Sequence, residues 1–129
     1  LNELCGITGC KILLDVNNIY VNSVNFSFDP VDFLSELNLS RVVEVHLAGH
    51  SEGRGGLLID THGAPIKKDV WSLYEWLVGR EGLIPTMIER DQHFPAWSEL
   101  EAELGYLKEI RGRRGADERF SKSVASPLS

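Results

Sequence analysis

Three short runs of apolar, often branched residues alternate along the chain with longer segments in which apolar side chains recur at helical spacing. The runs cover residues 11–16 (KILLDV), 41–47 (RVVEVHL) and 85–89 (PTMIE). Runs of this length and composition predict buried β-strands. Strands that alternate with helices predict a parallel sheet with right-handed crossover connections.

Helix signals follow each predicted strand. Asp29 is placed to cap a first helix with Pro30 at its first position, Asp69 to cap a second that ends at Gly82, and Ser98 to open a capping box for a third. Apolar positions at helical spacing support all three helices. They are Phe33, Leu34 and Leu37 in the first, Trp71, Tyr74, Leu77 and Val78 in the second, and Leu100, Leu104, Leu107 and Ile110 in the third.

The remaining segments are predicted as connections and ends. We expect irregular structure at 17–28 and at 48–68, the latter with a brief extended piece at 57–61. Residues 1–4 indicate a helix already under way, and the first residue is Leu rather than Met, so we expect the chain either to begin inside something larger or to have been trimmed. From residue 112 the chain is charged and then Ser-rich without periodicity, which predicts a disordered tail over 112–129 after a domain at 1–111.

The fold class is therefore α/β with about three parallel strand-helix units. Three strands cannot close a barrel, because the common (β/α) form takes about eight strands. Two architectures stay open at this point: an open parallel sheet, or part of a TIM-type barrel whose front half is absent.

Composition narrows the class of partner. The chain has 129 residues, 43% hydrophobic and 25% charged, with a formal net charge of −6, and so has the composition of an ordinary globular domain. Phosphate binding needs a basic face, so the acidic balance argues against nucleic acid, and we interpret the basic run at 108–114 as a solvated helix end. No apolar run approaches the roughly 20 residues of a membrane span. With no visible signal peptide, we expect a cytoplasmic chain whose two thiols, Cys5 and Cys10, are reduced, buried small residues.

Chemistry-bearing side chains end every predicted strand. Asp15 closes the first, His46 lies near the end of the second and Glu89 ends the third. Active sites of parallel α/β folds form at the carboxyl ends of the strands, so these three side chains are expected to meet. The loop after the second strand adds three more candidates, which are His50, Asp60 and His62. Charged groups inside apolar runs are costly unless they are paired or bound to a cation, so the joint pattern favours a metal site.

Each candidate alone also has a simpler explanation. Asp15 could cap a loop, His46 could be a hydrogen-bonded core histidine, and Glu89 could pair with Arg90 at the surface. His50, Asp60 and His62 could be plain loop or turn residues. Glu44 points to the same side as His46, either as a partner that orients it or as part of a structural ion pair. Oxygen and imidazole ligands without a thiolate favour iron, manganese or zinc, and the number of candidates fits more than one ion.

Four longer strings resemble a known family. They are ILLDVNNIYVNSVNFSFDP, VVEVHLAGH, IDTHGAPIKKDVWSLYEWLV and PTMIERD. Over residues 9 to about 103, the chain resembles the uncharacterised-domain family 692 (DUF692, UPF0276) of multinuclear non-haem iron-dependent oxidative enzymes, which are methanobactin-synthesis-oxidase-like. The resemblance implies a C-terminal portion of an eight-unit, xylose-isomerase-like barrel that binds two or three iron ions inside its strand ends.

The resemblance also implies roles for individual residues. Asp15, His46 and Glu89 are expected to be catalytic as well as metal-binding, and Asn18 matches a position that holds a ligand carboxylate or amide. The full set of implied metal ligands is Asp15, Asn18, His46, His50, Asp60, His62 and Glu89. Arg90 departs from the family pattern, in which an aromatic residue follows the glutamate. The further ligands that the resemblance implies, two histidines and a glutamate from earlier strands, are not in this chain, so we expect the iron site to be incomplete.

The implied activity is the oxidation, with dioxygen, of cysteine in a ribosomally made peptide, often presented by a partner protein. Two rival functions stay open. One is a zinc or manganese hydrolase or isomerase on the same barrel, and the other is a truncated, non-catalytic remnant that binds a partner. We expect no nucleic-acid or membrane partner, and a homo-oligomer or barrel completion in trans stays open.

Overall fold

The computed structural model describes the backbone of residues 1–124 and the side chains of residues 1–115. The helices and strands are, in order, α1 (Asn2–Thr8), β1 (Ile12–Asp15), α2 (Val16–Phe26), α3 (Pro30–Glu36), β2 (Val42–Leu47), β3 (Ser51–Glu52), β4 (Leu58–Ile59), α4 (Lys68–Glu81), β5 (Thr86–Ile88) and α5 (Trp97–Val124), with 3₁₀ turns at Leu39–Arg41 and Arg54–Gly56. None of these helices combines the length and apolar composition that crossing a bilayer requires.

The three predicted strands form one parallel sheet in the order β1-β2-β5. Asp15 pairs in register with His46, and Leu47 pairs with Ile88. The predicted alternation of parallel strands and helices is confirmed at this level, and the sheet is consistent with part of a barrel. A separate two-stranded antiparallel hairpin pairs β3 with β4; β4 lies within the extended piece predicted at 57–61, whereas β3 was not predicted.

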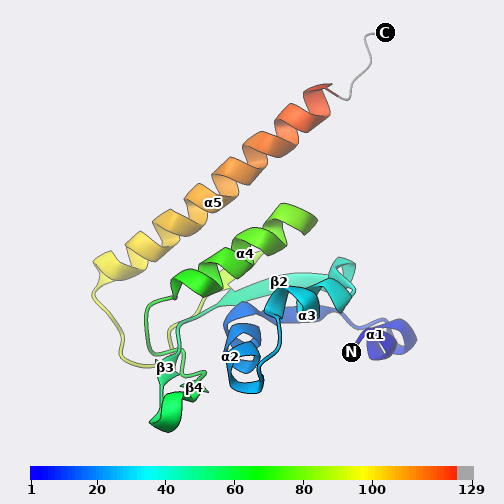
Figure 1. Cartoon of the computed structure of the whole chain (residues 1–129). Coiled ribbons are helices and arrows are strands. Elements are labelled where there is room, and N and C mark those ends of the chain that lie inside the picture. Colours follow the sequence, from blue (N-terminus) through cyan, green and yellow to red (C-terminus); the bar gives the residue numbers. More distant parts are fainter. Residues whose placement is uncertain (125–129) are drawn as a thin grey trace.

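The core lies between the sheet and the helices. Val45 and Leu47 of β2 are fully buried against Tyr74 and Leu77 of α4, and Leu34 of α3 joins the same cluster. Figure 1 shows α4 lying between the sheet and the long α5. The apolar spacing that predicted α4 is therefore the face that it buries.

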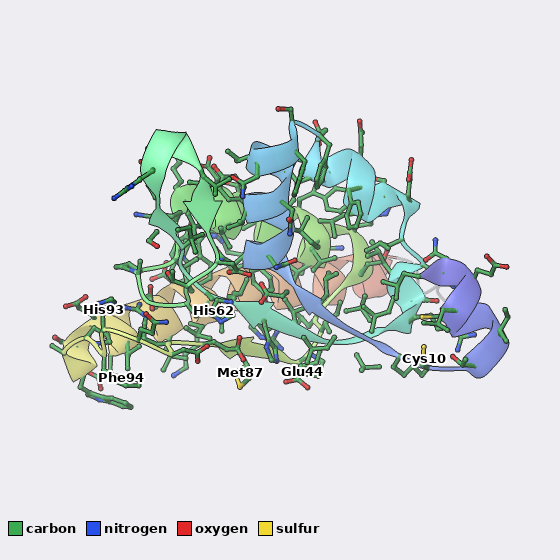
Figure 2. The ribbon with its side chains drawn as sticks, turned by 90° about the horizontal axis from the view of Figure 1, so that it is seen from below. Cys10, Glu44, His62, Met87, His93 and Phe94 are labelled. Carbon is green, nitrogen blue, oxygen red and sulfur yellow. The ribbon has the colours of Figure 1, made fainter. Side chains whose placement is uncertain are left out.

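The opposite face of the sheet carries exposed apolar side chains. Leu13 and Met87 are each about half exposed, at 54% and 44%, and their register partners, Glu44 and His46, lie on the same face. Met87 and Glu44 project from the side of the sheet away from the helices (Figure 2). The described residues thus leave one face of a parallel sheet uncovered, although parallel sheets are normally covered on both faces.

The segment after β1, which was predicted to be irregular, is instead α2. Its N-cap is Asp15, whose side chain accepts a hydrogen bond from the Asn18 backbone N–H at 2.8 Å. Val16, Ile19 and Val21 are buried, so tertiary packing outweighs the low helix propensity of the asparagines in this segment. The first residues of the strand-end motif therefore belong to a helix rather than to a loop.

Helix boundaries differ from the predicted ones in small ways. Asp29 caps α3 as predicted, accepting from the backbone N–H groups of Val31 and Asp32. The second helix has Lys67 rather than Asp69 at its N-cap, with Asp69 in the first turn. Differences of one or two residues are usual at helix ends.

The last helix is longer than the pattern predicted. It continues without a break to Val124, where a disordered tail was expected from residue 112, and residues 125–129 lie outside the described part. The Arg, Ala, Glu and Lys residues of this stretch are strong helix formers, which favours continuation of the helix beyond its apolar stripe. The domain boundary expected after residue 111 stays a prediction.

The two thiols lie beside each other at the start of the chain. Cys5 is buried and Cys10 is exposed, so the expectation of two buried residues holds only for Cys5. Their Sγ atoms are 3.5 Å apart and both are free thiols.

Candidate metal centre

Side chains that can bind a metal ion lie at the carboxyl ends of all three strands of the parallel sheet. Asp15 is the last residue of β1, and its register partner His46 lies one residue before the end of β2. Glu89 follows β5 directly, and its backbone N–H donates to the Leu47 carbonyl at 2.8 Å, which extends the ladder by one bond. The parallel topology is what brings residues 15, 46 and 89 to the same place.

The loop between β4 and α4 brings Asp60 and His62 over these strand ends. His62 has a left-handed backbone conformation, with φ 49°, which is uncommon for a residue other than glycine and is often found at functional sites. The loop lies directly on Gly49, where a Cβ atom would stand 2.0 Å from the Ala64 carbonyl oxygen. Gly49 is therefore what allows the loop to approach the end of β2. In Figure 2, His62 lies near the end of the sheet, well away from Cys10.

The His62 imidazole is surrounded by carboxylates. Its Nε2 atom lies 3.1 Å from Asp60 Oδ1 and 3.3 Å from Asp15 Oδ2. Its Nδ1 atom lies 3.2 Å from Glu89 Oε2 and 3.3 Å from Asp91 Oδ2. A neutral imidazole has one N–H and cannot donate to both sides at once, so this arrangement calls for additional positive charge.

His46 extends the group along the sheet. Its Nδ1 lies 2.8 Å from Glu89 Oε1, and its Nε2 lies 3.1 Å from Glu44 Oε1. Glu89 thus faces one imidazole with each of its two oxygens. Burial lowers the pKa of His46, but the carboxylates of Glu44 and Glu89 outweigh burial and raise this pKa above its ordinary value.

The other sequence-predicted residues lie around this group. Both Asp60 oxygens accept from asparagine amides: Oδ1 from Asn17, and Oδ2 from Asn18 at 2.9 Å. His50 lies behind Asn17, with its Nδ1 2.8 Å from Asn17 Oδ1. Burial and the nearby Lys67 lower the pKa of His50.

Sequence reasoning left two of these residues out. Asp91, the last residue of the PTMIERD string, was not selected as a candidate, and its N–H donates to the His62 carbonyl at 2.9 Å. Asn17, which is fully buried, lay in a segment predicted to be irregular, so nothing in the pattern marked it as more than a turn residue.

Arg90 packs inward rather than toward the group. Its guanidinium is 3.0 Å from Glu103 Oε2, and the two side chains are only 6% and 12% exposed. Glu103 Oε1 in turn accepts from the Ile66 backbone N–H at 2.8 Å. The pair therefore ties α5 to the end of the loop that carries Asp60 and His62.

The donor set fits a cation. Single ligand atoms of Asp15, His62 and Glu89 all lie within 4.8 Å of one another. In the surrounding group, five carboxylates contact only two imidazoles. Burial raises the pKa of Asp15, which shows that its negative charge is costly at this position. A metal ion would offset this excess of negative charge, and carboxylate with imidazole ligands suits iron, manganese or zinc. Cys5 and Cys10 precede β1, at the opposite end of the sheet, and so supply no thiolate here.

These features define a parallel α/β chain with a candidate Asp/His/Glu metal site at its strand ends. Residues 1–111 match the family described as RiPP precursor modification enzyme MbnB/TglH/ChrH. The chain belongs to this family, in agreement with the resemblance drawn from its sequence motifs.

Relatives of similar sequence are longer proteins. The chain is 49% identical over 118 residues to a UPF0276 protein of Caulobacter vibrioides, covering 90% of this chain and 42% of the relative. It is 47% identical over 110 residues to one of Rhizorhabdus wittichii, covering 85% and 39%, and 43% identical over 104 residues to one of Nitrosospira multiformis, covering 81% and 37%. The chain therefore spans about two fifths of the length of the curated relatives that it matches.

Proposed function

We propose that this chain forms part of an enzyme that oxidises cysteine in a ribosomally made peptide with dioxygen, at a centre of two or three iron ions. The family description supports the class of substrate, because it names enzymes that modify RiPP precursors. The observation that carries the proposal is the convergence of Asp15, His62 and Glu89 ligand atoms within 4.8 Å.

The residues of this chain would hold the metal from three directions. Asp15 and Glu89 offer carboxylate oxygens from the strand ends, and His62 offers an imidazole nitrogen from the loop above them. His46, Asp60 and Asn18 lie next to these three and are the further proposed ligands. Bound ferrous iron would supply one-electron chemistry with dioxygen, which amino-acid side chains cannot perform.

The protein's own contribution is to orient these groups. Glu44 lies 3.1 Å from His46 Nε2 and fixes the ring through that contact, as carboxylate partners of metal-binding histidines usually do. Glu89, placed by its backbone bond to Leu47, faces His46 and His62 with separate oxygens. Its carboxylate is therefore available to two neighbouring positions at once, which suits a centre with more than one ion.

We further propose that the sheet is part of an eight-unit barrel. The uncovered face with Leu13 and Met87 would be the barrel interior, and the strand ends its catalytic rim. A peptide substrate would enter from this rim, brought by a partner protein that presents it. Completion of the barrel by further chain, in cis or in trans, would supply the remaining ligands.

Two experiments test the proposal. In a full-length relative such as the Caulobacter vibrioides protein, the equivalents of His46→Ala and Glu89→Ala are expected to abolish iron-dependent oxidation of the precursor peptide, and full turnover by either variant would refute the assignment. Metal analysis of the same protein, purified without added metal, is expected to find iron. Stoichiometric zinc or manganese with hydrolase or isomerase activity would favour the rival enzyme class instead.

A further inference from the structure

A buried histidine and a buried asparagine lie directly behind Asp60. His50 is 6% exposed and Asn17 is fully buried, and they meet through His50 Nδ1 and Asn17 Oδ1 at 2.8 Å. The Tyr20 ring packs against His50 with centroids 5.3 Å apart, and the Tyr20 hydroxyl donates to Asp69 at 3.2 Å. This small cluster joins the start of α2 to the end of β2 and to the first turn of α4.

The direction of each hydrogen bond follows from the chemistry of Asp60. An ionised carboxylate can only accept, so the Asn17 group that faces Asp60 must be its NH₂. The Asn17 carbonyl oxygen must then face His50, and His50 must carry a proton on Nδ1 to donate to it. The contacts therefore form a one-way chain of donors from His50 through Asn17 to Asp60.

Asp60 is fixed on both of its oxygens by this arrangement. Asn17 donates to Oδ1, and Asn18 donates to Oδ2 at 2.9 Å. The same Oδ1 is the atom that lies 3.1 Å from His62 Nε2. The orientation of Asp60 toward His62 is thus set by two consecutive asparagines, one of which is held in turn by His50.

We propose that His50 and Asn17 are positioning residues that orient Asp60 for metal binding, and that His50 acts through its Nδ1–H rather than as a metal ligand. The inference rests on the proposed metal-dependent function and deepens it. It reassigns His50 from the ligand set that the sequence resemblance implied, because His50 lies behind Asn17 and is not one of the three residues whose ligand atoms converge.

Three variants of His50 test the chain of donors. His50→Ala removes the donor. His50→Asn retains an amide nitrogen at the same number of bonds from Cα as Nδ1, whereas His50→Gln places it one bond further out, at the position of Nε2. His93→Ala removes an exposed histidine outside the chain of donors and serves as the matched control.

The measurement is a titration of the 129-residue chain with Co²⁺, followed by visible absorption, with circular dichroism to establish that each variant is folded. Loss of a partner that orients a metal ligand typically weakens metal affinity about 10–100-fold. We expect this loss, with a shifted absorption spectrum, in His50→Ala and His50→Gln. We expect affinity and spectrum within about threefold of the parent in His50→Asn and in the control.

The possible results distinguish failure of the proposed metal binding from failure of the proposed positioning role of His50. If the parent chain does not bind Co²⁺, the metal proposal for this chain and the inference fail together. If the parent binds but His50→Asn is as weak as His50→Gln, the imidazole itself is required and the positioning role is refuted. Parent-like binding by both amide variants also overturns the role, because Nδ1 then has no special part. Should His50→Ala fail to fold, the comparison of Asn with Gln decides the question alone.

Discussion

Gly49→Ala is the substitution whose effect the structure defines best. The added Cβ would lie 2.0 Å from the Ala64 carbonyl oxygen and 2.5 Å from the Pro65 carbonyl oxygen, both backbone atoms that cannot rotate away. Ordinary contact begins at about 3.4 Å, so the loop that carries Asp60 and His62 must move by about 1.4 Å. Overpacking of this kind costs about 1–3 kcal/mol.

The two consequences are measured separately. Urea unfolding of the metal-free chain, followed by circular dichroism, is expected to show the loss of stability as a midpoint lowered by about 1 M, since slopes are about 1–3 kcal/mol/M in small proteins. Co²⁺ titration is expected to show affinity reduced at least tenfold, because a displacement of about 1 Å is enough to misplace reacting groups. The two effects share one cause, which is the displaced loop.

Gly79→Ala is the control for this prediction. Gly79 lies inside α4 with no heavy atom within 4 Å of a Cβ built there, so alanine should leave metal binding unchanged and stabilise the helix by about 0.5–1 kcal/mol. The reasoning is refuted if Gly49→Ala matches the parent in both urea midpoint and Co²⁺ affinity.

Three further predictions concern other parts of the chain. Glu89→Gln retains the shape of the side chain but removes its charge, and should weaken Co²⁺ binding at least tenfold; unchanged affinity in the titration would exclude Glu89 as a ligand. Arg90→Met leaves Glu103 buried without its cation and should cost about 3–5 kcal/mol in urea unfolding, whereas the double variant with Glu103→Gln should recover part of that loss. A loss in the double variant equal to the sum of the single losses would argue against the pair. The Thr8 hydroxyl and, to a smaller extent, the Cys5 thiol lower the pKa of Cys10. In Thr8→Val the rate of Cys10 alkylation by iodoacetamide should therefore reach half its maximum at a higher pH than in the parent. A pH profile of alkylation identical to that of the parent would contradict the role of Thr8.

The strands and the approximate place of the site follow directly from the sequence. Apolar runs bounded by polar segments identify β1, β2 and β5, and parallel topology then requires Asp15, His46 and Glu89 to lie at one edge. These conclusions depend only on short-range pattern and on a general rule of α/β folds, so no tertiary detail was needed to reach them.

The helix after β1 could not be predicted in the same way. Asparagine has low intrinsic helix propensity and is typical of turns, so four asparagines in residues 17–25 indicate a loop. Their true roles are tertiary: Asn25, for example, both donates to the Leu58 carbonyl and accepts from the Leu58 N–H at 2.9 Å, which pairs α2 with the hairpin. Contacts across more than thirty residues leave no local signature.

The inner organisation of the site was hidden for a related reason. The sequence offered seven ligand candidates, with Asp15, His46 and Glu89 singled out at the strand ends, but the structure arranges Asp15, His62 and Glu89 together, with Asn18 beside Asp60 and His50 behind Asn17. Spacing along the chain determines which strand end a residue occupies. It does not determine which residue contacts the next, because that depends on how the loop is folded over Gly49.

The three-strand register has a consequence for how many ions such an edge could accommodate. Neighbouring strands lie about 4.8 Å apart, so the backbones of β1 and β5, on either side of β2, are about 10 Å apart at this edge. Metal ions that share a bridging ligand are typically about 3.5–4 Å apart. The spacing of neighbouring strands is thus slightly larger than the separation of two bridged ions. Asp15 and Glu89 nevertheless bring ligand atoms within 4.8 Å of each other and of His62, and Glu89, whose other oxygen faces His46, occupies the position from which one side chain would reach a second ion.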